Sequence, residues 1–271
     1  MSQSGSKFIK SMSLINHLPQ KLSYQFQNRS ILKVISGLNN FDSNSVAMIA
    51  RAGSQGGADL IDIACDPRLV ELVKDLSSLS ICVSSIYPKL FVESVSAGAG
   101  LIEIGNYDVF YEQGMNFSAN DVLSMAKESK DLLPNIPLSA TIPHTLPLDQ
   151  QVDLAMKLVN QGVDIIQTEG GKSSKPFSPG VQGFFEKATP TLAATYMISQ
   201  EFIRNNISVQ IMSASGLSQS TCPLAIACGA SAVGVGSVVN KLDNLVSMIA
   251  AVRGLKESLQ NSIIKEKFLN I

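Results

Sequence analysis

Eight short apolar segments of four to eight residues alternate with segments in which apolar residues recur at helical spacing. This alternation constrains the chain strongly, because near-continuously apolar strands belong to a parallel sheet covered on both faces. Eight strand–helix units predict a single closed (β/α)₈ TIM barrel, with an open doubly wound sheet as the alternative. The expected strands are residues 31–38, 59–64, 80–84, 100–104, 138–142, 163–168, 208–213 and 232–235.

Length and composition agree with one barrel and exclude several classes of binding partner. The 271 residues match the about 250 that such a barrel needs. A net charge of −1 without a basic stripe argues against nucleic acid as a ligand, and no long apolar stretch predicts a membrane span. The four cysteines show no CxxC spacing, so we expect no zinc site and no disulfide, and we expect no cofactor. Assembly into a homo-oligomer is left open.

The N-terminal region admits two interpretations. The first 41 residues contain lysine and arginine but no acidic residue, a composition typical of organelle transit peptides. Leu14, Leu18, Leu22 and Phe26 nevertheless recur at helical spacing. We therefore predict a flexible tail over residues 1–12, followed by a barrel domain over residues 13–271. The domain begins with a short helix, residues 13–28, that plugs the bottom of the barrel.

Glycines recur just before the second, fourth, sixth and eighth expected strands. These are Gly57, Gly98, Gly162 and Gly229, and each is expected to end a helix with a positive φ. The recurrence suggests a doubled βαβα unit, although helix-to-strand junctions favour glycine in general.

Two long connections, residues 106–117 and 169–190, follow the fourth and sixth strands. Both lie on the face that carries the active site in barrel enzymes, where long glycine-rich loops are usually lids or ligand contacts. Lys172 is expected to steady a phosphate rather than to form a Schiff base, because it lies outside the strands. The ligand loop is expected to use Glu169, Gly170, Gly171 and Lys172.

Three titratable residues are predicted to point into the mouth as catalytic groups. Asp62 and Glu103 each interrupt an apolar strand, so we expect both to face the barrel interior in one layer. There they would act as acid and base or hold a divalent ion, unless they form a purely structural pair. His144 lies between prolines after the fifth strand and suits proton transfer, with helix capping as the alternative. Lys33 begins the first strand and is expected at the opposite end.

The last two strands end in glycine-rich turns. Barrels often bind phosphate with the loops after strands seven and eight, where backbone N–H groups surround the anion. The alternative is that these glycines only relieve crowding. The predicted phosphate-binding residues are Ser215, Gly216, Gly234, Gly236 and Ser237.

Five motifs together resemble one family, the hypothetical chloroplast reading frame family number twenty-three of algal plastids and cyanobacteria. They are residues 34–42, 102–108, 143–149, 167–171 and 214–218. The resemblance covers nearly everything after Leu14 and implies an aldolase-type barrel and a plastid setting, but no particular activity. More distantly, the rim resembles that of ribulose-phosphate-binding barrels and thiazole synthase. The sequence lacks the strand-borne catalytic lysine of the latter and the several metal-binding histidines of pentulose-phosphate epimerases.

The leading functional hypothesis is an enzyme that moves protons on a small phosphorylated metabolite, as an isomerase, epimerase or lyase does. The alternative is a non-catalytic sensor or scaffold that binds such a metabolite. Fold analogy does not separate these two. In either case the expected location is the chloroplast stroma.

Overall fold

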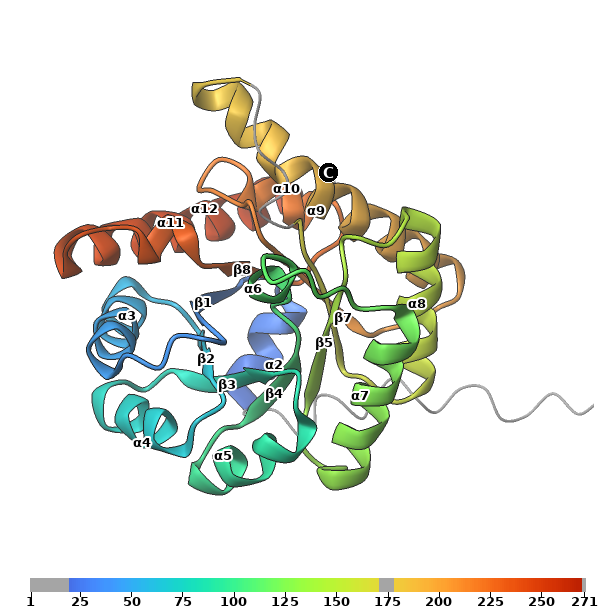
Figure 1. Ribbon diagram of the computed structural model, residues 1–271. Coiled ribbons are helices and arrows are strands. Elements are labelled where there is room, and N and C mark those ends of the chain that lie inside the picture. Colours follow the sequence, from blue (N-terminus) through green and yellow to red (C-terminus); the bar gives the residue numbers. More distant parts are fainter. Residues whose placement is uncertain (1–19, 171–177, 270–271) are drawn as a thin grey trace, which may run out of the picture.

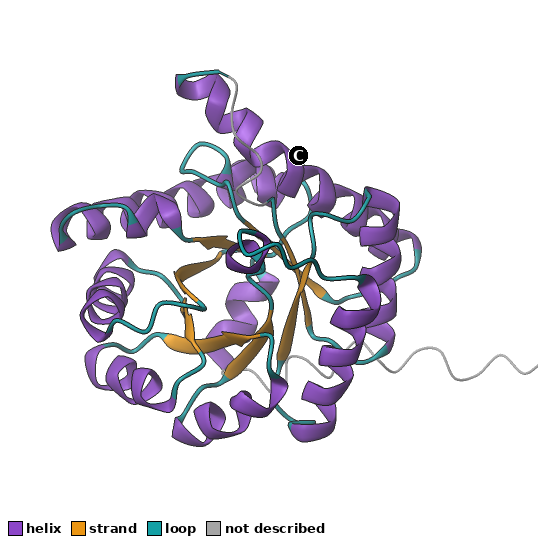
Figure 2. Ribbon diagram, in the orientation of Figure 1, coloured by secondary structure: helices purple, strands orange, loops and turns teal. Residues whose placement is uncertain are grey.

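The protein is described by a computed structural model that covers residues 20–170 and 178–269. Parallel strands close into a barrel in chain order, which confirms the (β/α)₈ prediction and rules out the open sheet (Figures 1 and 2). The strands are β1 (Ile31–Gly37), β2 (Leu60–Ala64), β3 (Ser80–Ser85), β4 (Leu101–Ile104), β5 (Leu138–Ile142), β6 (Ile165–Thr168), β7 (Gln210–Ala214) and β8 (Ala232–Val235).

Most of the helices surround the barrel and cover the outward faces of the strands (Figure 2). The helices of the described residues are α2 (Gln20–Gln27), α3 (Ser43–Gly56), α4 (Pro67–Leu76), η1 (Pro88–Leu90), α5 (Phe91–Ala97), α6 (Asp108–Tyr111), α7 (Ala119–Leu132), α8 (Leu148–Asn160), α9 (Gly180–Arg204), α10 (Cys222–Ala227), α11 (Ser237–Asn240) and α12 (Leu245–Leu269). Within the described residues, no helix combines the length and the apolar character that a membrane crossing requires.

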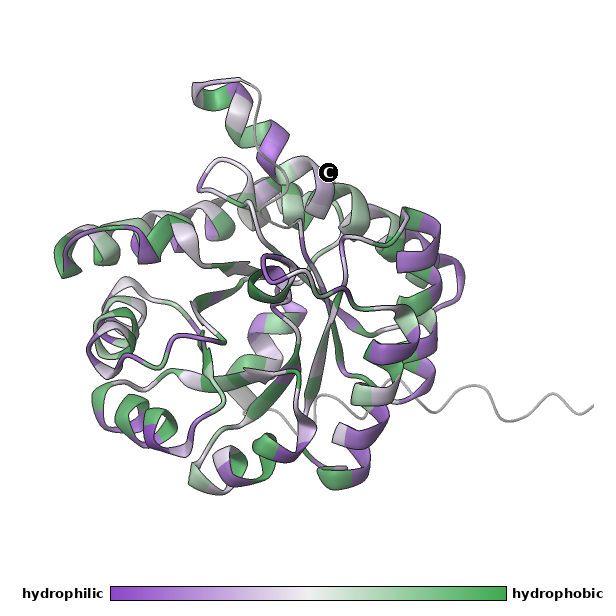
Figure 3. Ribbon diagram, in the orientation of Figure 1, coloured by the Kyte–Doolittle hydropathy of each residue, from purple (hydrophilic) through white to green (hydrophobic). Residues whose placement is uncertain are grey.

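Side chains along each strand alternate between the helix layer and the barrel interior. In β2, Ile61 and Ile63 belong to the large core between strands and helices, whereas Leu60 belongs to a separate cluster inside the barrel. The apolar colouring of the strands in Figure 3 follows from this arrangement, because both faces are buried.

The bottom of the barrel is closed by α2, as the sequence predicts. Leu22 and Phe26 of this helix are buried against the lowest interior layer of the barrel. The predicted helix starts at residue 13, and its first part lies outside the described residues, as does the predicted tail. The interior layer consists of Ile31, Leu60, Cys82, Leu101, Ile165, Met212 and Ala232.

The repeated junctions share one geometry. All four glycines, Gly57, Gly98, Gly162 and Gly229, have positive φ angles between 84° and 122°. In the first and third of these junctions an aspartate follows the glycine two residues later, and both aspartates accept a hydrogen bond from the backbone of the preceding strand. Asp59 accepts the backbone N–H of Leu32, and Asp164 accepts that of Leu138, so each ties its own strand to the start of the preceding one.

One predicted loop is partly wrong. The sequence predicts no regular structure over residues 169–190, but α9 begins at Gly180 and includes Pro190. A proline inside a helix costs about 3 kcal/mol. Here Ala188 and Thr191 on either side are buried, and Thr191 donates a hydrogen bond to the Ala214 carbonyl at 2.7 Å. These contacts with the barrel keep the helix continuous, and its first turns project beyond the barrel rim (Figure 1).

Candidate functional site

A pocket of about 800 Å³ opens at the C-terminal ends of the strands, the end of the barrel where the sequence places the site. This volume falls within the range of ligand pockets. Two lysines, Lys187 and Lys241, also line the pocket. All the residues predicted to bind phosphate line it: Ser215, Gly216, Gly234, Gly236 and Ser237.

The backbone at the end of β7 takes an uncommon conformation. Ser215 and Gly216 have φ angles of 73° and 71°. A Cβ atom on Gly216 would lie 2.4 Å from the Lys187 carbonyl oxygen, so only glycine fits there. Gly236 differs, because the nearest atom to an added Cβ is the Ile35 carbonyl oxygen at 3.5 Å. The fold therefore requires Gly216, whereas it tolerates a side chain at Gly236.

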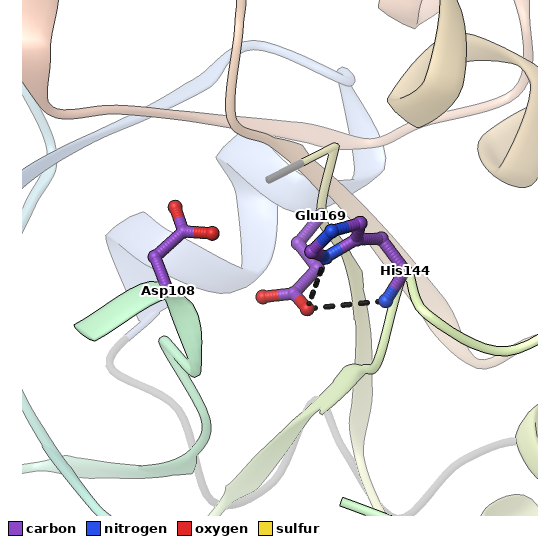
Figure 4. Close-up of side chains that lie close together, drawn as sticks. All are labelled: Asp108, His144 and Glu169. Carbon is purple, nitrogen blue, oxygen red and sulfur yellow. Dashed lines mark hydrogen bonds and ion pairs between the residues drawn. The ribbon is translucent and has the colours of Figure 1, made fainter. Parts of the chain in front are cut away.

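Three titratable side chains gather at the mouth (Figure 4). Asp108 and Glu169 line the pocket, and His144 is bonded to Glu169. The Nδ1 atom of His144 lies 3.0 Å from Oε1 of Glu169, and the backbone N–H of His144 donates to the same oxygen at 3.1 Å. Tyr111 also donates its hydroxyl to this oxygen at 2.8 Å. One ligand atom from each of Asp108, His144 and Glu169 lies within 4.8 Å of the others, so together they could hold a metal ion.

Burial and pairing set the protonation behaviour of this cluster. Burial raises the pKa of Glu169 above its ordinary value, although the hydrogen bond from His144 opposes that rise. Burial by itself lowers the pKa of His144, but the hydrogen bond and the charge of Glu169 outweigh it, so the pKa is raised. The two groups can therefore hold a proton between them, which is what acid–base chemistry requires.

The loop after β4 is shaped by two residues with positive φ, Gly105 and Asn106. A Cβ atom on Gly105 would lie 2.0 Å from Oγ1 of Thr141, so the loop can cross β5 closely only with glycine there. This conformation carries the chain over the barrel to Asp108. Backbone strain of this kind is common at functional sites.

Beneath the pocket lies a buried polar network. Glu103 and Asp62 face the barrel interior as predicted, and both are 0% exposed. Glu103 accepts hydrogen bonds from Lys33 at 2.6 Å, Ser139 at 2.8 Å and Gln167 at 2.7 Å. Asp62 accepts from Ser84 and from Asn106. Neither carboxylate lines the pocket.

Each buried carboxylate instead holds an amide side chain that does line the pocket. Asp62 holds Asn106 at 3.0 Å, and Glu103 holds Gln167. Since Nε2 of Gln167 donates to Glu103 and Thr141, its Oε1 is turned away from them. That oxygen has no hydrogen-bond partner among the residues that the structure describes.

The prediction that Lys33 lies at the opposite end holds for its backbone but not for its ammonium group. Its Cα pairs with the lower part of β2, but its long side chain extends along the barrel interior past Gly234 and reaches Glu103. Burial opposes its charge, yet the carboxylates of Glu103 and Asp62 raise its pKa above the ordinary value. Lys33 therefore supplies a fully buried cation that holds the network together.

The remaining predicted site residues fall on the loop after β6. Glu169 joins the cluster at the mouth, and Gly170 packs close to Thr191 of α9. Gly171 and Lys172 lie outside the described residues. Asp108, Gln167 and Lys33 were not singled out as functional residues. Lys33 could have been identified in the same way as Asp62, because each is a charged residue within an apolar strand.

Solved structures of low sequence identity share the fold. A 3-hexulose-6-phosphate synthase superposes with a TM-score of 0.61 at 14% identity, covering 84% of this chain and 99% of that one. An (S)-3-O-geranylgeranylglyceryl phosphate synthase from Thermoplasma acidophilum, in complex with its substrate sn-glycerol-1-phosphate, gives 0.60 at 14% identity and covers 93% and 100%. The aldolase QR15 gives 0.59 at 16% identity and covers 88% and 97%. These likenesses show the same barrel fold.

Sequence relatives are much closer. The "Uncharacterized protein ycf23" of Cyanophora paradoxa is 44% identical over 245 residues, which is 90% of this chain and 98% of the relative. The protein of the same name from Pyropia yezoensis is 35% identical over 258 residues, covering 92% and 93%. Residues 16–265 match the family described as "Protein of unknown function (DUF561)". The chain therefore belongs to the DUF561 family, whose ycf23 members carry the name of the chloroplast reading frame that its motifs resemble.

Proposed function

We propose that this protein is an enzyme that transfers protons on a small phosphorylated metabolite, as an isomerase, epimerase or lyase does. One observation carries the proposal: the glycine rim at the ends of β7 and β8 and the carboxylates Asp108 and Glu169, which follow β4 and β6, line one pocket. A ligand with its phosphate on the rim would extend its other end toward Glu169, which is paired with His144. That pair would give and take the proton.

Backbone N–H groups and lysine side chains would bind the phosphate group of the substrate. The turns at Gly216 and Gly236 allow an anion to approach backbone N–H groups closely, and Lys187 and Lys241 add positive charge to the same pocket. Two barrels with the same fold are named for phosphorylated compounds, a hexulose 6-phosphate and a glyceryl phosphate. Their names support a phosphorylated substrate class here.

Asp62 and Glu103 then contribute as positioning groups. They fix Asn106 and Gln167, two residues that line the pocket, so that both amide side chains are held in place beside a substrate. The proton-transfer role that the sequence suggested for these two carboxylates passes to Glu169 and His144, because only Glu169 of the four both titrates and lines the pocket.

The rim is tested by Gly236→Val, since Gly236 lines the pocket and an added Cβ there meets no atom closer than 3.5 Å, so the backbone need not move. We expect isothermal titration calorimetry to show inorganic phosphate binding to the native protein and none to Gly236→Val. The matched control is Gly100→Val, because Gly100 precedes β4 at the bottom of the barrel and an added Cβ there meets nothing within 4 Å. Absence of phosphate binding to the native protein would refute the rim assignment.

The alternative, a non-catalytic metabolite sensor, shares the rim and differs in chemistry. Mass spectrometry of small molecules retained by the purified protein identifies the ligand class. Incubation of that ligand in deuterated water then tests for proton exchange, which an enzyme of the proposed type catalyses and a sensor does not. Within the cell we place the protein in the plastid, with the chloroplast stroma as its compartment.

A further inference from the structure

We infer that Asp108, His144 and Glu169 form a binding site for one divalent transition-metal ion at the mouth of the barrel. Their ligand atoms lie within 4.8 Å of one another. They come from three neighbouring positions at the C-terminal ends of the strands: the loop after β4, the loop after β5 and the end of β6. Figure 4 shows the Asp108 side chain on one side and the Glu169 and His144 side chains together on the other.

The distances suit an ion of this class. Two ligand atoms at right angles around an ion, each about 2.1 Å from it, are about 3.0 Å apart. Nδ1 of His144 and Oε1 of Glu169 are separated by 3.0 Å across a hydrogen bond, so an ion that takes the place of the shared proton would meet both atoms at this spacing. Asp108 is partly exposed at the start of α6, and one of its carboxylate oxygens lies within 4.8 Å of the other two ligand atoms.

Surrounding contacts orient two of the ligands in advance. Glu169 is 5% exposed and is held by the Tyr111 hydroxyl and the backbone N–H of His144. The Tyr111 ring meets the His144 ring edge-on, with centroids 5.0 Å apart and an interplanar angle of 82°. Such outer contacts are what fix metal ligands in established sites.

The ligand set also selects the ion. One imidazole and two carboxylates favour Mn²⁺, Fe²⁺ or Zn²⁺, because Ca²⁺ and Mg²⁺ prefer oxygen ligands throughout. Three protein ligands leave coordination positions open for water or a ligand. The buried pair Asp62 and Glu103 is a poorer choice, because the Lys33 ammonium already lies 2.6 Å from Glu103.

Metal binding at this cluster requires nothing of the phosphate rim. A consequence for catalysis does rest on the proposed function: His144 and Glu169 would hold the ion, and the ion would supply Lewis acidity toward an oxygen of the substrate.

The test is a titration of chelator-treated protein with Mn²⁺, in which electron paramagnetic resonance measures the free ion. We expect one ion per chain. Asp108→Asn and His144→Gln should each weaken binding by more than about tenfold, and Tyr111→Phe, which removes an outer contact, by about tenfold. Asp153→Asn replaces an exposed carboxylate on α8 and should leave the affinity unchanged.

A second readout guards against misfolded variants. Pulsed electron paramagnetic resonance should detect an imidazole nitrogen coupled to Mn²⁺ in the native protein and none in His144→Gln. The inference is overturned if the native protein binds no ion, or if binding survives Asp108→Asn but is lost in Asp62→Asn. Phosphate calorimetry on the same samples separates the two proposals, since Mn²⁺ binding without phosphate binding would refute the proposed function alone.

Discussion

Replacing Lys33 by Met is expected to lower the free energy of unfolding by about 3–5 kcal/mol. Lys33 and Glu103 are both 0% exposed, and their charged atoms lie 2.6 Å apart. Removing the ammonium leaves the Glu103 carboxylate buried without its cation, and a buried unpaired charge is far more costly than a lost surface contact. Glu103→Gln should have a comparable cost at neutral pH, because it leaves the lysine unpaired instead.

The double variant Lys33→Met/Glu103→Gln should cost much less than the sum of the two single variants. It removes both charges, and replacing a whole buried ion pair is often close to neutral. The introduced glutamine would still accept one hydrogen bond from Ser139 or Gln167, the neighbours that now donate to Glu103. Urea unfolding at pH 7 measures all four members of the cycle.

A surface pair provides the control. Lys157 and Asp153 form an ion pair one helical turn apart on α8, with side chains 53% and 62% exposed. Lys157→Met should change stability by less than about 1 kcal/mol. Additive effects of Lys33→Met and Glu103→Gln would show that the two buried charges are not coupled. Lys33 would then not hold the polar network beneath the pocket together.

The fold followed from the sequence because its determinants are local. Every predicted strand lies within two residues of the observed one, since apolar runs bounded by glycine or polar residues are set by burial on both faces. The four junction glycines were predicted for the same reason. Pro190 shows the limit: local preference breaks the helix there, but contacts between Thr191 and the end of β7 override it.

The site followed in part. The position of the glycine turns beside the pocket was predictable because it depends only on the ends of β7 and β8, while their binding of phosphate stays a prediction. Lys33 was misplaced because strand period gives the direction of a side chain and not its reach. Asp108 depends on the left-handed backbone at Asn106, and Gln167 on a hydrogen bond to a residue 64 positions away. Neither the backbone conformation at Asn106 nor this long-range hydrogen bond can be predicted from the residues nearby in the sequence.

Asp62 should give the protein a distinctive dependence on pH. Burial raises the pKa of Asp62 to about 7, repulsion from Glu103 adds to the rise, and the charge of Lys33 opposes it. The titratable groups that face it are Lys33 from β1, Cys82 from β3 and Glu103 from β4. Burial keeps the Cys82 thiol protonated by raising its pKa, so the carboxyl group of Asp62 is the one expected to change its charge near neutrality.

The sign of the effect follows from linkage. Below about pH 4 both the folded and the unfolded chain hold the Asp62 proton, and its contribution to stability is fully present. Between about pH 4 and pH 7 the unfolded chain releases the proton while the folded chain keeps it, so the free energy of unfolding falls by up to about 1.4 kcal/mol per pH unit.

Asp62→Asn lacks this dependence but retains other titrating groups, including His144, whose effects cancel in the comparison. Urea unfolding of both proteins between about pH 4.5 and 8 should therefore show Asp62→Asn gaining on the native protein as pH rises to about 7, with no further gain above it. A difference that stays constant over this range would mean that Lys33 keeps Asp62 ionised throughout, and the carboxylate would then belong to a permanent ion network rather than to a group that titrates near neutral pH.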